Sequence, residues 1–488
     1  MIKRLGILPA LALAGCVSMP AIKQPAPELP AAWPESLPAS SATAAEGKAA
    51  GEIMPQAMTQ AWWRIFNDPQ LDRLMDEALA GSQDLKLAAA RVLEAEANLR
   101  STGAALLPEV DATVTASRNR RSLQTSPLLP AGTPTHYNNF GAGLQASYEV
   151  DLWGRIRAST DSARADLLAT RYAGEVVRQT LTQNVAQAWF NLNALGLRER
   201  LTRETLANRV DAARLTERRF EVGTVSEFEV RQAQAEAAAL ESQLAQIDQQ
   251  ARLQENALGV LLGRSPRALV QLRIQAEDLK ALAPPPEIPA GLPSELLQRR
   301  PDLRQAEASL ASTQASIREA RAALFPSLTL TGNLGSASAS LSDLFSGPSM
   351  AWGLGANLAQ SLFNGGRTEA AIQARSARQD QALAAYESTA RQAFREVLDA
   401  LVAHRQTREI WAAEGKRVEA LARATQLAES RFNAGAASQL DVLDAQRNLY
   451  QAQQNAIDAS RARLSAAASL VKALGGGWQV QPQTDRSR

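Results

Sequence analysis

The chain has 488 residues, enough for a large core, and a formal net charge of +2. This near-neutral balance gives no electrostatic basis for binding nucleic acid. One cysteine and two distant histidines, His136 and His404, nearly exclude a His/Cys metal site, and the chain has neither a Gly-rich phosphate loop nor a GxSxG motif, so no cofactor and no enzyme activity are expected.

The N-terminus has the pattern of an export signal. Basic residues in Met1–Arg4 precede a short apolar stretch, Leu5–Ala14, which is typical of a secretory signal. The sequence Leu-Ala-Gly-Cys ending at Cys16 resembles a bacterial lipobox. It predicts that residues 1–15 are a lipoprotein signal peptide and that lipidated Cys16 anchors the mature chain to a membrane. The alternative is a free cysteine within an ordinary signal peptide.

Residues 16–65 are expected to form an extended tether and an equatorial segment, because many are Pro, Ala or Ser. A helical run follows to about Leu106, and Pro108 closes it. Two strands come next, at about 110–117 and 140–152. In the second, apolar and polar residues alternate for about 13 positions, long enough for a tilted membrane strand.

The second half of the chain has two similar strands, at about 327–335 and 352–363. Aromatic residues lie near the strand ends, as an interfacial girdle requires: Phe140, Tyr148, Trp153, Phe325, Trp352 and Phe363. No later stretch has the roughly 20 apolar residues of a spanning helix, so a membrane crossing would need these strands. The alternative is a half-buried sheet in a soluble sandwich. Four strands are too few for a closed barrel, so the membrane interpretation requires oligomerisation.

Two very long helices are predicted, at 155–220 and 367–432, since neither stretch contains proline. At about 1.5 Å per residue, each would be roughly 100 Å long. Shorter helices are expected at 226–263, 294–323 and 438–474. The helices 226–263 and 294–323 together match one long helix in length, which indicates a wall of one continuous helix beside two stacked ones.

The chain contains an internal duplication. Arg219–Gly223 recurs as Arg431–Gly435, an offset of 212 positions, and Leu262–Gly263 recurs as Leu474–Gly475. A constant offset over about 110 residues indicates a repeated supersecondary unit. The expected layout is therefore repeat 1 at 66–263, an equatorial linker at 264–293, repeat 2 at 294–476 and a C-terminal tail at 477–488.

These features together resemble the TolC-like outer membrane factors, and more narrowly their lipoprotein (NodT-like, OprM-like) branch. Further local matches are Trp62-Trp63, Asp68-Pro69, Arg299–Arg304 and Phe325–Leu330. The resemblance covers Cys16 to about Gly476, and the order of the features is specific although no single motif is decisive.

The resemblance implies an α+β membrane protein: a homotrimer with a 12-stranded outer-membrane β-barrel, four strands per chain, continuous with a long periplasmic α-helical barrel. It implies the exit channel of a tripartite efflux system for drugs and toxic compounds. The implied partners are outer-membrane lipid, a periplasmic adaptor and an inner-membrane pump, usually of the RND class. Substrate identity is not encoded here, since in this family the pump chooses most substrates.

The two helix hairpins would form the periplasmic tip. Gly223 and Gly435 are expected to end the long helices, and Ser226 and Ser438 to cap the next helices, with Glu229 and Asp441 completing capping boxes.

Asp444 has no such structural role, and the first repeat has Gln232 in its place. By the resemblance, Asp441 and Asp444 would supply six carboxylates around a periplasmic gate that favours cations. The alternative is ordinary cap and surface acids. The turns expected to dock the adaptor are Gly223, Thr224, Val225, Gly435, Ala436 and Ala437.

Other functions remain as alternatives. A type I secretion duct would have the same channel architecture. A trimeric coiled-coil surface protein would explain the long helices but not strand pairs within a duplication. A periplasmic adaptor would have one helical hairpin flanked by β-rich halves, whereas this chain has two.

Overall fold

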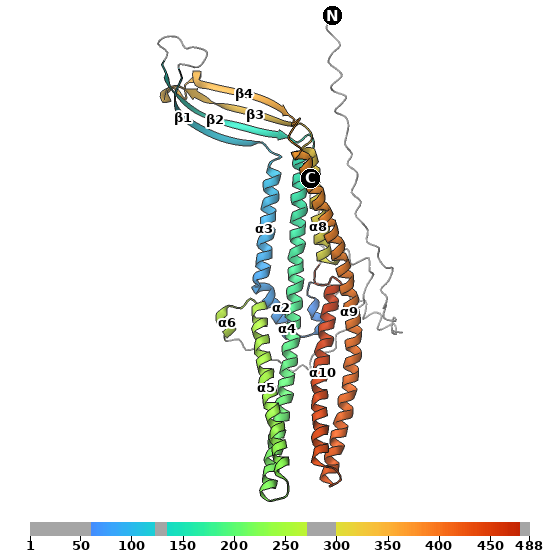
Figure 1. The fold of residues 1–488 in the computed structure, drawn as a ribbon. Helices are drawn as coiled ribbons and strands as arrows, with labels where there is room; N and C mark the ends of the chain where they lie inside the picture. Colours follow the sequence, from blue (N-terminus) through green and yellow to red (C-terminus); the bar gives the residue numbers. More distant parts are fainter. Residues whose placement is uncertain (1–59, 123–133, 271–298, 479–488) are drawn as a thin grey trace.

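The computed structural model describes residues 60–122, 134–270 and 299–478. The molecule is a long rod with a β-sheet at one end and two helical hairpins at the other (Figure 1). Its elements are η1 (Trp62–Phe66), α2 (Pro69–Gly81), α3 (Gln83–Ala104), β1 (Glu109–Arg120), β2 (His136–Val150), α4 (Arg155–Glu221), α5 (Glu227–Leu261), α6 (Pro266–Val270), α8 (Pro301–Ala322), β3 (Ser327–Ser338), η4 (Leu341–Asp343), η5 (Gly347–Ser349), β4 (Met350–Ala359), α9 (Arg367–Asn433) and α10 (Gln439–Ala473).

The four strands form one antiparallel sheet in the order β1-β2-β3-β4. Helices α3 and α8 lead into β1 and β3, and β2 and β4 lead back into α4 and α9. The helix-side ends of all four strands therefore lie together, and the hairpin ends of both strand pairs point away from the helices (Figure 1).

The strand register places apolar side chains on one face of the sheet. Val114 of β1 lies opposite Ala142 of β2, and Leu144 of β2 lies opposite Leu334 of β3. The polar face carries residues such as Thr115, Gln145, Asn333 and Asn357 on the alternate positions. The apolar face comprises Val110, Ala112, Val114, Ala116, Phe140, Ala142, Leu144, Ala146, Tyr148, Val150, Leu328, Leu330, Leu334, Met350, Trp352, Leu354, Ala356 and Leu358.

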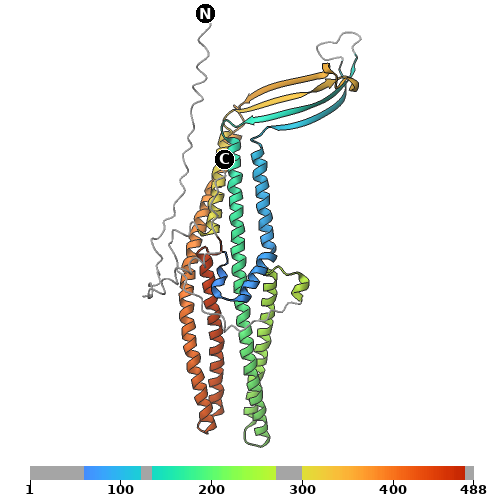
Figure 2. The same cartoon turned by 180° about the vertical axis from the view of Figure 1, so that it is seen from behind.

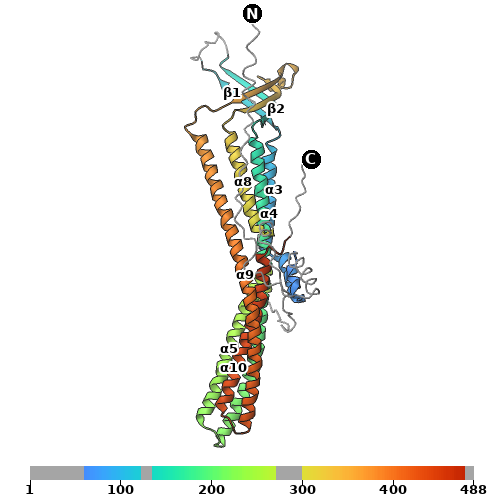
Figure 3. The ribbon, with the colours of Figure 1, turned by 90° about the vertical axis from the view of Figure 1, so that its right-hand side faces the viewer.

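Each long helix lies beside two stacked shorter ones, as expected, but the stacked pairs differ from the predicted pair of 226–263 and 294–323. The end of α5 meets the start of α3 at Gly263 and Gly81, and the end of α10 meets the start of α8 at Gly475 and Arg299. α4 packs against α3 and α8 in its sheet-side half and against α5 in its lower half, and α9 packs against α8 above and α10 below. Figure 3 shows α9, α8, α4 and α3 side by side beneath the sheet. Within the described part of the chain, no helix is long and apolar enough to cross a membrane.

Corresponding helices of the two repeats have equal lengths. α4 and α9 have 67 residues each, α5 and α10 have 35, and α3 and α8 have 22. The stacked helices meet at repeated glycines. A Cβ at Gly263 would lie 2.2 Å from the Gly81 carbonyl oxygen, and one at Gly475 would lie 2.5 Å from that of Arg299.

The main hydrophobic core lies at mid-height, where the stacked helices meet. Trp62 and Trp63 are buried with Phe66 against Phe190, whose ring lies 5.0 Å from that of Phe66. Trp189 donates to Asp68, the residue that caps α2. Helix α4 contributes Leu181, Val185, Ala188 and Leu192, which are spaced by four and three residues and all buried. This core holds the joints between the short helices.

The strand bounds differ from the predicted ones. β1 and β3 run three residues further outward, to Arg120 and Ser338, because ladder hydrogen bonds continue where apolar alternation stops. β2 starts at His136 and ends at Val150, rather than running from 140 to 152. Its end is set by the next residue, Asp151, which accepts hydrogen bonds from two backbone amides at the start of α4. The sequence-based bounds were wrong at these positions.

β4 runs from Met350 to Ala359 instead of 352–363. Its last residue pairs with Ser327, the first of β3, so no partner strand remains for residues 360–363. Phe363, expected near a strand end, lies in this loop and is 92% exposed.

The helical run predicted to reach Leu106 is split at Ser82, whose hydroxyl accepts from the Leu85 amide and starts α3. The helix predicted at 294–323 begins at Pro301, because extended Arg300 precedes it. Part of the predicted linker, Pro266–Val270, forms the short helix α6. Residues 294–298 and 271–293 lie outside the described residues.

Substituting Gly475 by alanine should destabilise the fold strongly. Gly475 has φ +79°, and its Cβ would also collide with the Arg299 carbonyl. We expect a loss of about 3 kcal/mol in unfolding free energy. The matched control is Gly435→Ala, with φ +73° but open space around the Cβ, which should cost about 1 kcal/mol. Thermal unfolding followed by circular dichroism measures both; equal shifts would show that the helix joint does not require glycine.

Candidate functional site

The tip of the molecule consists of the turns that join α4 to α5 and α9 to α10 (Figure 2). Gly223 has φ +77° and Gly435 φ +73°, the left-handed conformation that ends a helix. The Thr224 amide donates to the Arg219 carbonyl at 2.9 Å, and the Ala436 amide to the Arg431 carbonyl at 2.8 Å. The two tips therefore have the same backbone, as their sequences predicted.

Both following helices begin with a capping box. The Ser226 amide donates to Glu229 at 2.7 Å, and the Ser438 amide donates to Asp441 at 2.8 Å. The hydrogen bonds from the Ser438 backbone and side chain, with the nearby Arg431 charge, lower the pKa of Asp441. Asp441 is therefore ionised at neutral pH.

Asp444 lies one helical turn after Asp441 and is partly exposed. It accepts a hydrogen bond from Arg447 at 2.7 Å. In a single chain both carboxylates thus have partners on their own helix, one a cap and one an i,i+3 ion pair. Exposed pairs of this kind contribute little to stability, so Asp444 is free to serve another purpose.

The tip also exposes large apolar side chains. Val222 is 73% exposed and Phe228 75% exposed. Phe220, in the last turn of α4, is 43% exposed. Phe432, its counterpart, is half-buried. These side chains make the tip a surface suited to contact with another protein.

A polar link joins the two hairpins just above the tip. Arg209 of α4 donates to Gln446 of α10 at 2.7 Å, and Gln446 donates to Glu429 of α9 at 2.7 Å. Arg209 is 7% exposed, and this burial lowers its pKa. The repeat partner of Gln446, Gln234, accepts only from Arg231 on its own exposed helix.

Further polar contacts continue this link towards mid-height. Thr202 and Tyr450 share a hydrogen bond of 2.8 Å, and Arg198 donates to Gln454 at 2.7 Å. Neither Gln446 nor Arg209 is among the functional residues predicted from the sequence. The sequence does show an arginine among packed positions of α4. Its role can be recognised only once the structure places α10 beside α4.

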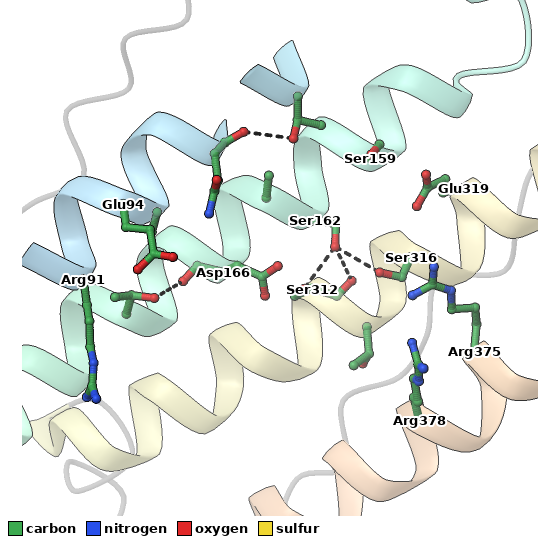
Figure 4. Close-up of a pocket in the computed structure, with 16 residues that line it drawn as sticks. Arg91, Glu94, Ser159, Ser162, Asp166, Ser312, Ser316, Glu319, Arg375 and Arg378 are labelled. Atoms are coloured by element: carbon green, nitrogen blue, oxygen red, sulfur yellow. Dashed lines mark hydrogen bonds between the residues drawn. The ribbon is translucent and has the colours of Figure 1, made fainter. Parts of the chain in front are cut away.

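A cavity of about 770 Å³ lies between the sheet-side halves of α3, α4, α8 and α9 (Figure 4). Its floor includes Ser162, which bonds Ser312 and Ser316 at 3.0 Å. Its charged side chains come from all four helices: Arg91, Glu94, Asp166, Glu319, Arg375 and Arg378. The cavity is polar and open, with acids and bases in equal number.

The histidines do not take part in these sites. His136 starts β2 at the outer end of the sheet, and His404 is buried in α9. In residues 60–122, 134–270 and 299–478, no group of three or more His, Cys, Asp or Glu side chains is placed to hold a metal ion. Cys16, the predicted lipidation site, lies outside the described residues.

The chain is similar to known outer-membrane proteins. The family model described as Outer membrane efflux protein matches residues 74–264 and 292–476. The pyoverdine export outer membrane protein OpmQ of Pseudomonas aeruginosa is 40% identical over 86% of this chain and 88% of its own length. The probable efflux pump outer membrane protein TtgC of Pseudomonas putida is 36% identical over 97% and 95%. The open-state MtrE outer membrane channel of Neisseria gonorrhoeae superposes with a TM-score of 0.80 at 29% identity, covering 95% and 98%.

Replacing Gln446 by alanine should weaken the lower part of the molecule. It would leave the buried Arg209 guanidinium without its amide acceptor, at a cost of about 1–3 kcal/mol. The repeat-matched control Gln234→Ala removes an exposed contact on a single helix, so its effect should stay within about 0.5 kcal/mol. Hydrogen exchange along α10 and the thermal midpoint report the difference. Equal exchange rates in the two variants would contradict a structural link at Arg209.

Proposed function

Since the chain belongs to the outer membrane efflux protein family, we propose that it is the exit channel of a tripartite efflux system, a passive duct for small molecules. The observation that carries this proposal is the sheet with one apolar and one polar face, continuous with helices of 67 residues. Such helices are roughly 100 Å long. A sheet that crosses the outer membrane and a stalk that crosses the periplasm require these two parts.

The assembly is a homotrimer. In the single chain β1 and β4 each have one neighbour in the sheet, so their outer edges have unpaired backbone groups, which is costly in lipid. Pairing β4 of one copy with β1 of the next closes a barrel of 12 strands from three chains. In this assembly the helices would continue the barrel as a tunnel.

The polar cavity beneath the sheet belongs to the lining of this tunnel. Its α4 residues Ser159, Ser162 and Asp166 share one helical face, and the cavity reaches all four helices of the row at once. We infer that the row of helices curves around this cavity in the trimer. A wall of serines and balanced charges suits a duct that retains no single class of compound.

The tip is the periplasmic end. The exposed apolar side chains near the turns support docking of a periplasmic adaptor at Gly223–Val225 and Gly435–Ala437. The adaptor would connect the channel to an inner-membrane pump, for which the RND class is our proposal. Lipidated Cys16 would anchor the N-terminus in the outer membrane.

Asp441 and Asp444 form the periplasmic gate. Three copies of α10 around one axis would bring six carboxylates together, where like charges attract cations and repel anions. The capped, ionised state of Asp441 supports this role. So does the difference between the repeats, because Gln232 leaves the other hairpin without the second acid.

The channel function predicts a heat-resistant trimer in outer-membrane fractions and discrete conductance steps in planar bilayers. Host cells in which the gene for this chain is deleted should retain more of a small dye and be more sensitive to drugs, and re-expression should reverse both effects. A coiled-coil surface protein would give a trimer without conductance. A type I secretion duct would instead lose export of a protein while small-molecule resistance stays unchanged.

The gate is tested by Asp441→Ala/Asp444→Ala. Cation-over-anion selectivity should fall, because six negative charges leave the constriction, and the reversal potential in a salt gradient measures it. The matched control is Glu229→Ala/Gln232→Ala, which removes the equivalent helix cap from the first repeat and should leave selectivity intact. If the double aspartate variant has the wild-type reversal potential, the gate assignment is wrong.

A further inference from the structure

Two arginines stand at the outer end of the sheet. Arg118 and Arg120 are the last two positions of β1 on the same face as Val114 and Ala116, and they lie opposite Asn138 and His136 of β2. All four side chains are exposed. We call Arg118 and Arg120 the outer arginine pair.

The outer arginine pair lies on the apolar face of the sheet. Side chains alternate along a strand, so Arg118 and Arg120 share a face with Val114 and Ala116 of the same strand. The polar face at this end carries Ser117 and Asn119 instead. The face that is apolar along most of the sheet therefore ends in two cations.

The position of the pair along the strand matches the depth of lipid headgroups. Tyr148 and Phe140, both on the apolar face of β2, are eight residues apart, or about 26 Å at about 3.3 Å per residue. In a strand tilted by about 40°, this length covers roughly 20 Å of depth, most of an outward-facing apolar band that is about 25 Å tall with aromatic residues at its edges. Arg118 lies opposite Asn138, two residues beyond Phe140, which places it at the outer edge of this band.

Nothing on this hairpin neutralises the pair. From Ala112 to Tyr148 the sequence has no acidic residue, and within the described residues neither Arg118 nor Arg120 has an ion pair or a hydrogen bond from its side chain. The adjacent Arg121 is different, since its guanidinium lies 4.6 Å from the centre of the Tyr137 ring.

The second hairpin has no such cations. The matching places in β3 are Ser336 and Ser338, and from Leu328 to Leu358 there is no Lys or Arg and one acid, Asp343. The sheet fold therefore does not require arginine at this position. The charge is specific to the first strand pair.

We propose that the outer arginine pair binds phosphate groups on lipid headgroups of the outer leaflet, a site that rests on the sheet spanning the outer membrane as proposed above. Arginine presents a planar fork of donors that matches phosphate. With long apolar stems along the lipid face and charged ends at the headgroups, the two side chains suit this depth. Three copies per trimer would place three such sites around the barrel.

The test compares the full-length channel with Arg118→Gln/Arg120→Gln, purified in detergent and titrated with lipid A bearing two phosphates, one phosphate or none. Native mass spectrometry counts retained lipid. Wild type should retain the bisphosphorylated form best, and the variant should bind it about tenfold more weakly. Arg118→Lys/Arg120→Lys, which keeps the charge but loses the fork, should fall between them. The control Arg214→Gln/Arg218→Gln changes the same charge near the tip and should bind like wild type.

Three outcomes would overturn the proposal. The first is equal lipid retention by wild type and the glutamine variant in channels that still insert and conduct. The second is displacement of lipid A by inorganic phosphate at equal concentration, which would indicate a free-anion site. The third is loss of the heat-resistant trimer in both the glutamine variant and Asp343→Asn with lipid retention unchanged, which would assign the pair to a subunit contact. Failure of the wild-type channel itself to insert and conduct would instead contradict the proposed function.

Discussion

The structure depends on covering two helices of 67 residues along their full length. A helix this long is stable only while its apolar stripe is packed, and no single short helix reaches from end to end. Each long helix is therefore covered by two stacked helices, and the stack needs a joint with no side chain between the ends. Gly263 and Gly475 supply those joints, each against a carbonyl oxygen of the segment above. The mid-height core of Trp62, Phe66 and Phe190 then holds the joints in place.

The sheet imposes the second constraint, because it is open on both edges in one chain. Lipid does not hydrate the free backbone groups of β1 and β4, so membership of the efflux channel family and the sheet topology lead to the same trimer. In the proposed channel, the polar face of the sheet and the polar helical cavity belong to one continuous duct. Conduction needs no catalytic group, and the chemistry of the chain is concentrated at the two ends of the duct.

The duplication explains where that chemistry lies. The repeats agree in helix lengths, turn glycines and helix caps, all of which the fold needs twice. They differ in sequence at Asp444 and Gln232 and at the outer ends of β1 and β3, and they differ in contacts at the identical residues Gln446 and Gln234. The difference between Asp444 and Gln232 can be read from the sequence, since the two residues occupy equivalent helical positions. The importance of Gln446 cannot, because it depends on the contact with Arg209. The position of the arginines on the apolar face likewise depends on the strand register. Two of these differences, Asp444 and the outer arginine pair, are the residues to which we assign the proposed roles.

The sequence by itself determined the order of elements, the duplication, the tip turns and the two faces of the sheet, because hydrophobic period, proline, glycine and capping residues act locally. The sequence placed the long helices within one or two residues. It misplaced several strand ends and did not predict the break at Ser82. Strand ends are set by whether a neighbouring strand is available, as Ser327 decides for Ala359. Only the tertiary structure decided which helix lies beside which, since the link from Arg209 to Gln446 joins residues 237 positions apart. Such contacts follow from packing of whole faces, which no local pattern encodes.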